Sequence, residues 1–355
     1  MRIAIVNDLM MAREALRRAV ASVPEHRVAW LARDGAEAVE LARADRPDLI
    51  LMDLIMPGVD GVEATRRIMA QSPCAIVVVT SSVSAHLGRV YEAMGLGALD
   101  AVDTPELGPS GDVAGARLML EKIATVAKLI GRSPRLVRPS DDPRPPPPPP
   151  PPPEGMPSWP LVAIGCSTGG PAALAEILGG LPDTRDSAVV IVQHVDAAFA
   201  PGLAQWLGER AGRAVELVEP GDRPLPGKVL LAATNDHVIL DDLRSFRYVA
   251  EPADYHYRPS VDVFFGSLAR NWPEPGAAVL LTGMGRDGAL GLLALRRTGW
   301  LTIAQDQATS VVWGMPRAAV EVDAAELVLP LAEVAAAISD RVRERAHRLP
   351  GAARR

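Results

Sequence analysis

The sequence predicts an α/β protein built from two doubly wound domains, each with a mostly parallel sheet. Short apolar runs alternate with amphipathic stretches along most of the 355 residues, which is the pattern of repeated β–α units. Nine consecutive prolines, residues 145–153, divide this pattern into two parts. The chain is long enough for each part to bury a core of its own. We therefore expect two α/β domains joined by a linker.

Five buried parallel strands are expected before the prolines. They are IAIV (3–6), VAWLA (28–32), LILM (49–52), AIVVV (75–79) and ALDAV (98–102). The helices between them include MAREALRRAV (11–20), GAEAVELARA (35–44), GVEATRRIM (61–69) and HLGRVYEAM (86–94). Such a domain binds its ligands beyond the carboxyl ends of the strands.

The same alternation resumes after the prolines. The expected strands are LVAIG (161–165), AVVIVQH (188–194), VLLAAT (229–234), AAVLLTG (277–283) and LTIAQ (301–305). PAALAEILGGL (171–181) and ALGLLALRRTG (289–299) are the expected helices, and HVIL (237–240) with FRYV (246–249) forms a hairpin. This part is a second α/β domain, and it shows no internal repeat of the first.

The proline run is expected to be a stiff spacer. Proline fixes φ and lacks an N–H group, so residues 145–153 cannot join a helix or a sheet interior. A polyproline II segment of this length spans about 28 Å at about 3.1 Å per residue. The alternative is a ligand for an SH3-type domain, but a proline run between two periodic regions is more often a linker.

Composition and charge exclude several classes of protein. The net charge of −6, with scattered basic residues, argues against a nucleic-acid binder. Cys74 and Cys166 lie in apolar, strand-like surroundings, offer no metal-site spacing and are expected to be reduced, buried thiols. No apolar stretch reaches the length of a membrane span, and the N-terminus has no signal pattern. We expect a cytoplasmic protein that does not insert into membranes.

Two aspartates and a threonine end strands of the first domain. Asp8 follows the first strand, Asp53 follows the third, and Thr80 ends the fourth. The carboxyl ends of parallel strands meet at one edge, so the two carboxylates should lie close together, where they suit Mg²⁺. The alternative is that such aspartates cap the next helix. For Asp53 this is disfavoured, because a Pro-Gly turn follows it rather than a helix start.

The second domain contains a candidate nucleophile. Residues 165–169, Gly-Cys-Ser-Thr-Gly, fit the pattern G-x-S-x-G between a strand and a helix. This geometry exposes the hydroxyl of Ser167 and directs backbone N–H groups toward an incoming oxyanion. The alternative is that small residues at this turn only allow close packing. Further partners for Ser167 are therefore needed.

A histidine and an aspartate are expected to complete the site. Among the six histidines, His194 alone ends a predicted central strand in the unit that follows Ser167, and Asp287 follows another strand. The three can converge at one sheet edge as nucleophile, base and orienting carboxylate. A rival interpretation takes residues 283–288 as a dinucleotide-binding G-x-G-x-x-G with Asp306 on the ribose. It would place Asp287 against a pyrophosphate and leave Ser167 and His194 without a role.

The first domain, residues 1–120, resembles a response-regulator receiver domain, whose fold is flavodoxin-like. The run DLIMPGVDG at 53–61 matches the phosphoacceptor loop of that family. The resemblance implies that Asp53 is phosphorylated, that Asp8 and Asp53 bind Mg²⁺, and that Thr80 is the switch hydroxyl. Two departures stand out. Asn7 replaces one of two usual acids, which should weaken the metal, and Thr104 replaces a usual lysine, which puts coupling to the switch in doubt.

The second domain resembles the catalytic domain of chemotaxis protein-glutamate methylesterases (CheB-like). The matching stretches are IGCSTGGP, IVQH, RPSVDVFF, LTGMGRDGALG and GMP (314–316). The resemblance implies that Ser167 is the nucleophile, His194 the base and Asp287 its orienter, that Met284 donates a backbone N–H to the oxyanion, and that Thr168 supports the site. The NDLMMA start, the DTP motif and the prolines are most similar to methylesterases of Wsp-type surface-sensing pathways.

These resemblances define the expected organisation and function. We expect a receiver domain at 1–120, a linker at 121–156, a methylesterase domain at 157–348 and a tail at 349–355. The expected activity is phosphorylation-regulated hydrolysis of glutamate methyl esters on chemoreceptors, with deamidation of glutamines as a second reaction. A histidine kinase would donate the phosphate, with Mg²⁺ for that step and no cofactor for ester hydrolysis. The alternative is a non-enzymatic receiver protein whose second domain binds a partner or a dinucleotide.

Overall fold

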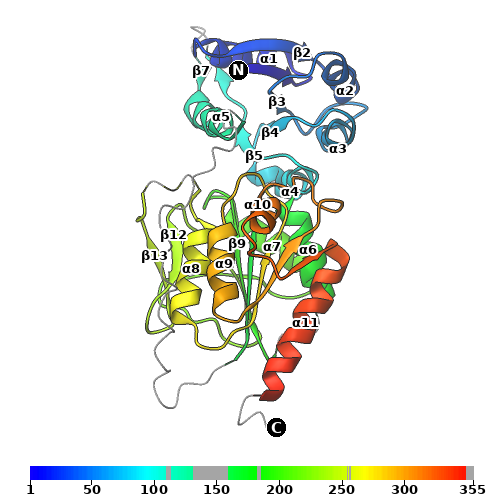
Figure 1. Ribbon diagram of the computed structural model, residues 1–355. Helices are drawn as coiled ribbons and strands as arrows, with labels where there is room; N and C mark the ends of the chain where they lie inside the picture. The colour runs from blue at the N-terminus through cyan, green and yellow to red at the C-terminus, as the bar shows by residue number, and fades with distance from the viewer. Residues whose placement is uncertain (109–112, 131–158, 182–184, 254, 256, 349–355) are drawn as a thin grey trace. The chain divides into compact units, whose positions relative to one another are not determined.

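The structure, a computed structural model, divides the chain into two compact units, one in residues 1–138 and the other in residues 139–355 (Figure 1). Residues 109–112, 131–158, 182–184, 254, 256 and 349–355 are not described. The expected proline linker and the C-terminal tail therefore lie outside the described residues. Each unit is considered by itself below. None of the helices in the described ranges has the length and apolar character needed to cross a membrane.

The first unit is a parallel sheet flanked by helices, in the strand order β2-β1-β3-β4-β5. Its strands are β1 (Arg2–Val6), β2 (Arg27–Ala32), β3 (Leu49–Met52), β4 (Ala75–Thr80) and β5 (Asp100–Asp103). Its helices are α1 (Met10–Ala21), α2 (Gly35–Ala44), α3 (Gly61–Gln71), the short 3₁₀ helix η1 (Ser84–His86), α4 (Leu87–Gly95) and α5 (Ala116–Ile130). All sheet pairings are parallel, as expected for a doubly wound domain.

Local sequence explains where these elements form. Every residue of β3 and β4 is buried, which accounts for their unbroken apolar runs. Helix α2 begins after Asp34, whose side chain accepts a hydrogen bond from Glu37 N at 2.9 Å. Asp60 caps α3 in the same way through Glu63 N, also at 2.9 Å. Capping and burial thus fix the predicted elements within a residue or two.

The C-terminal part of this unit departs from the expected boundary at residue 120. After β5 the chain forms a small antiparallel pair, β6 (Glu106–Leu107) with β7 (Val113–Ala114), and then enters α5. Helix α5 buries Met119 and Ile123 in the core of the unit. Residues 121–130, which we assigned to the linker, are therefore helix, and Ile123 and Val126 of this segment are buried in the core.

The second unit is also a parallel sheet between helices, in the order β10-β11-β9-β8-β14-β15-β16. Its strands are β8 (Leu161–Cys166), β9 (Ala188–Gln193), β10 (Glu216–Leu217), β11 (Val229–Leu231), β14 (Ala277–Leu280), β15 (Leu301–Gln305) and β16 (Leu327–Leu329). Its helices are α6 (Gly170–Gly180), α7 (Ala200–Ala211), α8 (Val261–Asn271), α9 (Ala289–Arg297), α10 (Met315–Glu321) and α11 (Leu331–Arg348).

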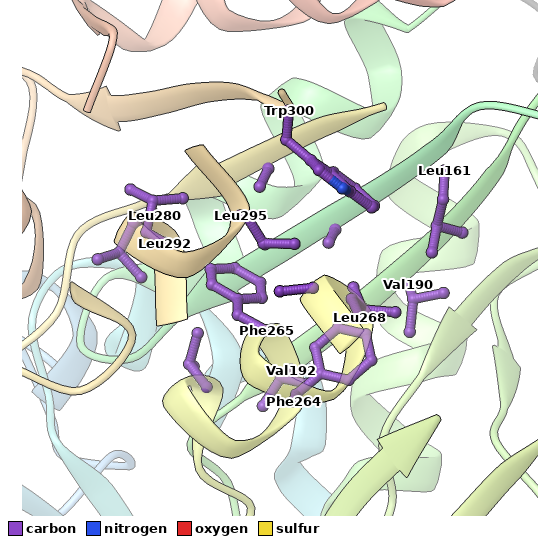
Figure 2. Packing of buried hydrophobic residues seen from close by; sticks show 14 of the residues in the cluster. Leu161, Val190, Val192, Phe264, Phe265, Leu268, Leu280, Leu292, Leu295 and Trp300 are labelled. Carbon is purple, nitrogen blue, oxygen red and sulfur yellow. The ribbon is translucent and has the colours of Figure 1, made fainter. Parts of the chain in front are cut away.

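The predicted hairpin leads into a helix that covers one face of this sheet. Strands β12 (His237–Leu240) and β13 (Phe246–Val249) pair antiparallel, as expected. Helix α8 then packs against α9, and Phe264, Phe265 and Leu268 of α8 enter the core beside Trp300 (Figure 2). Sequence analysis missed α7, α8, α10 and α11. The motif RPSVDVFF thus spans the start of α8, which brings its polar residues to the sheet edge.

The order of the strands places one position at the centre of the sheet. Strand β8 pairs with β9 on one side and with β14 on the other. The chain runs outward from β8 to β9 and later returns to β14, so the direction of winding reverses beside β8. Ligand sites in such sheets lie at this switch point, beyond the carboxyl ends of the strands. Ser167 is the first residue after β8.

Candidate active site

Ser167 lies in a tight turn between β8 and α6. Its N–H donates to Thr282 O at 3.1 Å, and its carbonyl accepts from Gly170 N at 2.8 Å. Gly169 has φ of +79°, and a Cβ there would lie 2.7 Å from the side chain of Val311. Glycine is thus required both by the backbone and by space. The predicted strand–turn–helix context of G-x-S-x-G is present.

His194 and Asp287 form a buried pair next to this turn. Nε2 of His194 and Oδ2 of Asp287 are 2.8 Å apart, and both side chains are less than 10% exposed. His194 N donates to Cys166 O, so the histidine directly neighbours the serine across the two strands. In the neutral imidazole, donation from Nε2 to an ionised Asp287 makes Nδ1 the unprotonated nitrogen. Within the described residues Nδ1 is buried and has no hydrogen-bond partner, so this nitrogen is left for a further contact.

The carboxylate of Asp287 is held at the start of helix α8. Besides His194, it accepts from Ser260 Oγ at 2.7 Å, Val261 N at 2.7 Å and Asp262 N at 3.1 Å. Burial acts to raise the pKa of Asp287, but the hydrogen bonds from His194, Ser260 and Val261 outweigh burial and lower it. Asp287 is thus kept ionised by donors that stabilise its charged form.

A fully buried glutamine joins the serine turn to the histidine. Gln193 Nε2 donates to Ser167 O at 3.0 Å and to His194 O at 3.1 Å. On the opposite side of β8, Thr282 Oγ1 donates to Thr168 O at 2.9 Å. Each buried polar side chain therefore ties together loops from neighbouring strands, which fixes the relative positions of the two candidate catalytic residues.

The loop after β14 closes over the serine turn. A Cβ on Gly283 would lie 2.8 Å from Ser167 Cβ and 2.3 Å from Met315 Sδ, so only glycine allows this approach. The carbonyl of Gly283 accepts from Gly314 N and Met315 N, which fastens the loop to helix α10. Among the described residues, the backbone N–H groups of Met284 and Thr168 have no hydrogen-bond partner. Both are therefore available to an oxyanion.

Three polar residues around Asp287 were not singled out by sequence analysis. Ser260 and Asp262 belong to the start of α8, and Tyr257 lies in the loop before it. Asp262 Oδ1 accepts from Gly291 N at 2.7 Å, at the start of α9. Burial and the neighbouring charge of Asp287 raise the pKa of Asp262 to about 7. The motif Ser-Val-Asp, typical of a capped helix start, was the available signal.

The two cysteines and His237 are not further candidates for nucleophile and base. Burial raises the pKa of the Cys166 thiol far above its usual value and that of Cys74 to about 11, so neither is an active thiol. His237 is fully buried, with Nε2 3.1 Å from Pro252 O and Nδ1 accepting from Ser260 N at 3.2 Å. It supports the Asp287 site rather than serving Ser167.

The dinucleotide interpretation of residues 283–288 does not fit this geometry. Asp306 uses its carboxylate to accept from Thr309 N at 3.0 Å within its own loop. Gly314 packs against the backbone of residues 283–285, where a pyrophosphate would have to approach. Asp287 caps helix α8 and holds His194. The loop is therefore built around the serine and histidine.

The first unit places its three predicted residues at one sheet edge. Asp53 is 7% exposed, and its Oδ2 accepts from Asn7 Nδ2 at 2.8 Å. The pKa of Asp53 is raised to about 6. Burial and the charge of Asp8 raise it, and the N–H groups of Ile55 and Leu54 lower it by less. The hydroxyl of Thr80 is buried without a hydrogen-bond partner among the described residues. The edge thus offers two neighbouring acids and a free hydroxyl.

The two departures at this edge have distinct structural effects. Asn7 directs its amide N–H at Asp53 and accepts from Leu9 N through Oδ1 at 2.9 Å, so it brings a donor and no negative charge to this edge. Thr104 N continues the sheet to Thr80 O at 2.8 Å. The described residues contain no group of three or more His, Cys, Asp or Glu arranged for a metal. Asp8 and Asp53 still supply the carboxylate chemistry that Mg²⁺ prefers.

Comparisons with known proteins agree with this division. Residues 3–106 match the family model described as the response regulator receiver domain, and residues 162–338 match the model described as CheB methylesterase. A relative from Burkholderia lata is 54% identical over 94% of this chain and 97% of its own length. One from Pseudomonas aeruginosa is 52% identical over 96% of this chain and 99% of its own length. Both carry the name protein-glutamate methylesterase/protein-glutamine glutaminase.

Fold and comparisons define a class: a receiver domain followed by an α/β methylesterase domain with a buried serine–histidine–aspartate constellation. At this identity and coverage, the chain belongs to the CheB-like family of protein-glutamate methylesterases/protein-glutamine glutaminases.

Proposed function

We propose that this chain is a phosphorylation-regulated serine esterase that hydrolyses glutamate methyl esters on chemoreceptors and also deamidates receptor glutamines. The supporting observation is the pair of His194 and Asp287, 2.8 Å apart and buried, beside a serine that follows the neighbouring strand β8. This arrangement supplies a nucleophile, a base and a group that fixes the base. The names of the relatives support the same activity.

In the proposed reaction Ser167 attacks the γ-carbonyl carbon of the ester, and its proton passes to Nδ1 of His194. His194 then returns this proton to the leaving methoxide, so that methanol departs and an acyl-serine remains. Water attacks the acyl-serine by the reverse proton path and releases the glutamate carboxylate. With glutamine the leaving group is ammonia. Asp287 keeps Nε2 protonated throughout and stabilises the imidazolium.

The oxyanion of each tetrahedral intermediate is assigned to the backbone N–H groups of Met284 and Thr168. Both N–H groups lack a partner among the described residues and belong to the two loops that meet at Ser167. Donors of this kind, fixed before the reaction, are worth about 10²- to 10³-fold in rate each. Thr168 is held in place by Thr282 through its carbonyl oxygen.

The receiver domain is proposed to regulate this reaction by phosphorylation of Asp53. When bound, Mg²⁺ would neutralise phosphoryl oxygens, and Asp8 and Asp53 would hold it. The raised pKa of Asp53, about 6, means that its reactive carboxylate form predominates above that pH. The hydroxyl of Thr80, which has no hydrogen-bond partner among the described residues, supports the proposal that it binds a group carried by Asp53. The domain limits are proposed as 1–130 for the receiver and 157–348 for the esterase.

The proposed partners follow from the family. Methyl-accepting chemoreceptors are the substrate, and a histidine kinase of the same chemosensory pathway is the phosphodonor. The similarity of the NDLMMA and DTP segments further suggests a pathway of the Wsp surface-sensing type. Receptor methylation sites and kinases of this kind lie in the cytoplasm, so we propose that the protein acts there.

Methanol release from a methylated receptor domain tests the activity directly. The purified full chain should release methanol, and release should increase when Mg²⁺ and a small phosphodonor such as acetyl phosphate are added. Ser167→Ala should show no release in either condition, whereas Asp53→Asn should stay at the rate without phosphodonor. Turnover close to normal in Ser167→Ala would exclude the serine mechanism.

A further inference from the structure

The ring of Tyr257 lies flat on the imidazole of His194. The two ring centroids are 4.0 Å apart and the planes differ by 7°, which is a face-to-face stack. Tyr257 comes from the loop between β13 and α8, so the stack joins a loop outside the central sheet to the end of β9. Neither the sequence pattern nor the resemblance assigned this residue a role.

The loop that carries Tyr257 is anchored on both sides. Buried His237 contacts its start through Pro252 O and its end through Ser260 N, at 3.1 and 3.2 Å. The phenol oxygen lies 3.5 Å from Met284 O, and a Cβ on Gly285 would lie 3.1 Å from it. Tyr257 is therefore held between the base and the loop that carries the proposed oxyanion donor.

A ring in this position restricts the histidine. Rotation of the imidazole about its Cβ–Cγ bond would break the 2.8 Å contact of Nε2 with Asp287 and turn Nδ1 away from Ser167. The stacked ring blocks this rotation on one face and shields that face from water. It also places π electrons against the imidazolium that forms during the reaction, which favours the cation. Burial and the charge of Asp287 raise the pKa of the phenol, so it stays neutral at ordinary pH.

We propose that Tyr257 is a positioning residue for the base, whose aromatic face holds the imidazole of His194 in the orientation that serves both Asp287 and Ser167. The proposal rests on the proposed function of Ser167 and His194. It assigns the effect to the aromatic face and not to the hydroxyl, because the phenol contact to Met284 O is at the limit of a hydrogen bond. Phenylalanine should therefore replace tyrosine, and an aliphatic side chain of similar size should not.

The kinetic test compares Tyr257→Phe with Tyr257→Leu in the full chain, with methylated receptor as substrate. We expect kcat to remain within about 3-fold in Tyr257→Phe and to fall about 10- to 100-fold in Tyr257→Leu, with KM changed less than 3-fold in both. Tyr255→Leu is the matched control, because Tyr255 lies on the same loop, is 37% exposed and contacts the edge of His237 instead of His194. Its kcat should stay within about 2-fold.

A second readout does not depend on catalysis. In the full chain with ¹⁵N-labelled histidine, the Nε2–H proton of His194 should give a protected downfield resonance that Tyr257→Phe retains and Tyr257→Leu loses by exchange. Asp287→Asn, which replaces the charged acceptor of this proton with a neutral amide, shifts or removes the resonance and so assigns it. If Tyr257→Leu fails to fold by circular dichroism, Tyr257→Met provides the same comparison.

The outcomes separate this proposal from the proposed function. An unchanged kcat and resonance in Tyr257→Leu would overturn the positioning role, as would an equal loss of kcat in Tyr257→Phe and Tyr257→Leu. Full turnover in Ser167→Ala would instead overturn the serine mechanism, whatever Tyr257 does to the resonance of His194.

Discussion

Each of the two units buries an aspartate beyond the end of a strand, and the two carboxylates have opposite electrostatic surroundings. Asp287 accepts hydrogen bonds from His194, Ser260, Val261 and Asp262, and its pKa is lowered although it is almost completely buried. Asp53 accepts one from Asn7 and a longer one, 3.3 Å, from Ile55 N, and the N–H group of Leu54 also lowers its pKa. Its pKa is raised to about 6.

At Asp287 the hydrogen bonds and the charge of His194 outweigh burial, whereas at Asp53 burial outweighs the donors. In the proposed reaction the carboxylate of Asp287 must remain ionised, and its four hydrogen bonds stabilise that charged form. A carboxylate that accepts a phosphoryl group must keep its oxygens accessible to that group and to a cation. Fewer donors at Asp53 leave it more reactive but less stabilised.

The largest effect on kcat is expected from removing the negative charge of Asp287. In Asp287→Asn the side chain can present an N–H to His194, which favours the wrong imidazole tautomer. In the well-known serine protease case such a change lowers kcat by about 10⁴, and we expect about 10³- to 10⁴-fold here. Methanol release measures it. Asp306→Asn is the matched control, because Asp306 also follows a strand of this sheet but its carboxylate accepts, among the described residues, only from Thr309 in its own loop.

If Asp287→Asn retained more than about a tenth of kcat, Asp287 would act only as a helix cap, and the contrast with Asp53 would lose its catalytic meaning. Loss of activity in Asp306→Asn to the same extent would point to a general effect on the sheet edge.

A smaller loss of activity is expected from crowding the serine turn without changing any charge. In Gly283→Ala the new methyl group would lie 2.8 Å from Ser167 Cβ and 2.3 Å from Met315 Sδ, so the loop carrying Met284 must move. A shift of this kind should lower kcat about 100-fold. Gly179→Ala in helix α6 is the control, because nothing lies within 4 Å of its added Cβ. Equal kcat values in the two variants would contradict the proposed close approach.

The sequence predicted the central part of both sites because strand ends are visible as the ends of apolar runs. Ser167, His194 and Asp53 directly follow such runs, and the sheet brings them to the expected edges. Tyr257, Ser260 and Asp262 were missed because they follow the β12–β13 hairpin and not a strand of the central sheet. The periodicity of the sequence does not show where a hairpin and the helix after it pack against the sheet. The relation of Asn7 to Asp53 also needed coordinates, because sequence cannot show which end of an amide faces a carboxylate.

A moderate effect on Mg²⁺ affinity is expected at the receiver site when the amide of Asn7 is replaced by a carboxylate. In Asn7→Asp the amide N–H on Asp53 is lost and a third carboxylate joins Asp8 and Asp53. Mg²⁺ should bind about 10-fold more tightly because one more negative charge faces a hard cation. Without Mg²⁺ the variant should unfold more easily, because two carboxylates then face each other where the amide donated at 2.8 Å. Calorimetric titration and thermal unfolding measure the two effects.

Asn235→Asp provides the control for this prediction, since Asn235 is exposed and belongs to the other unit. It adds the same charge and should leave Mg²⁺ affinity unchanged. Equal or weaker affinity in Asn7→Asp would mean that Asn7 does not face the cation, and that the receiver tolerates the departure for another reason.

The smallest expected effect concerns Asp262, the second acid beside Asp287. The pair of Asp262 and Asp287 can be compared with the pair of Asp8 and Asp53 in the first unit. Asp262 keeps a pKa raised to about 7 because burial and the charge of Asp287 outweigh the N–H groups at the start of α9. A raised acid pKa means that the folded state binds a proton that the unfolded state releases at about pH 4. The contribution of Asp262 to stability is therefore complete below about pH 4 and is lost as pH rises to about 7.

Asp262→Asn removes this titration but keeps an oxygen for Gly291 N. Between pH 5 and pH 7 the free energy of unfolding of the wild type should therefore fall relative to the variant, by about 1 kcal/mol per pH unit. Denaturant unfolding followed by tryptophan fluorescence measures this free energy. Trp30 is the only one of the six tryptophans before the proline run, so the signal comes mainly from the part of the chain that contains Asp262. If the free energies of unfolding of the wild type and Asp262→Asn changed in parallel with pH, Asp262 would be ionised like Asp287. The N–H groups at the start of α9 would then stabilise the charge of Asp262 as fully as the donors at the start of α8 stabilise that of Asp287.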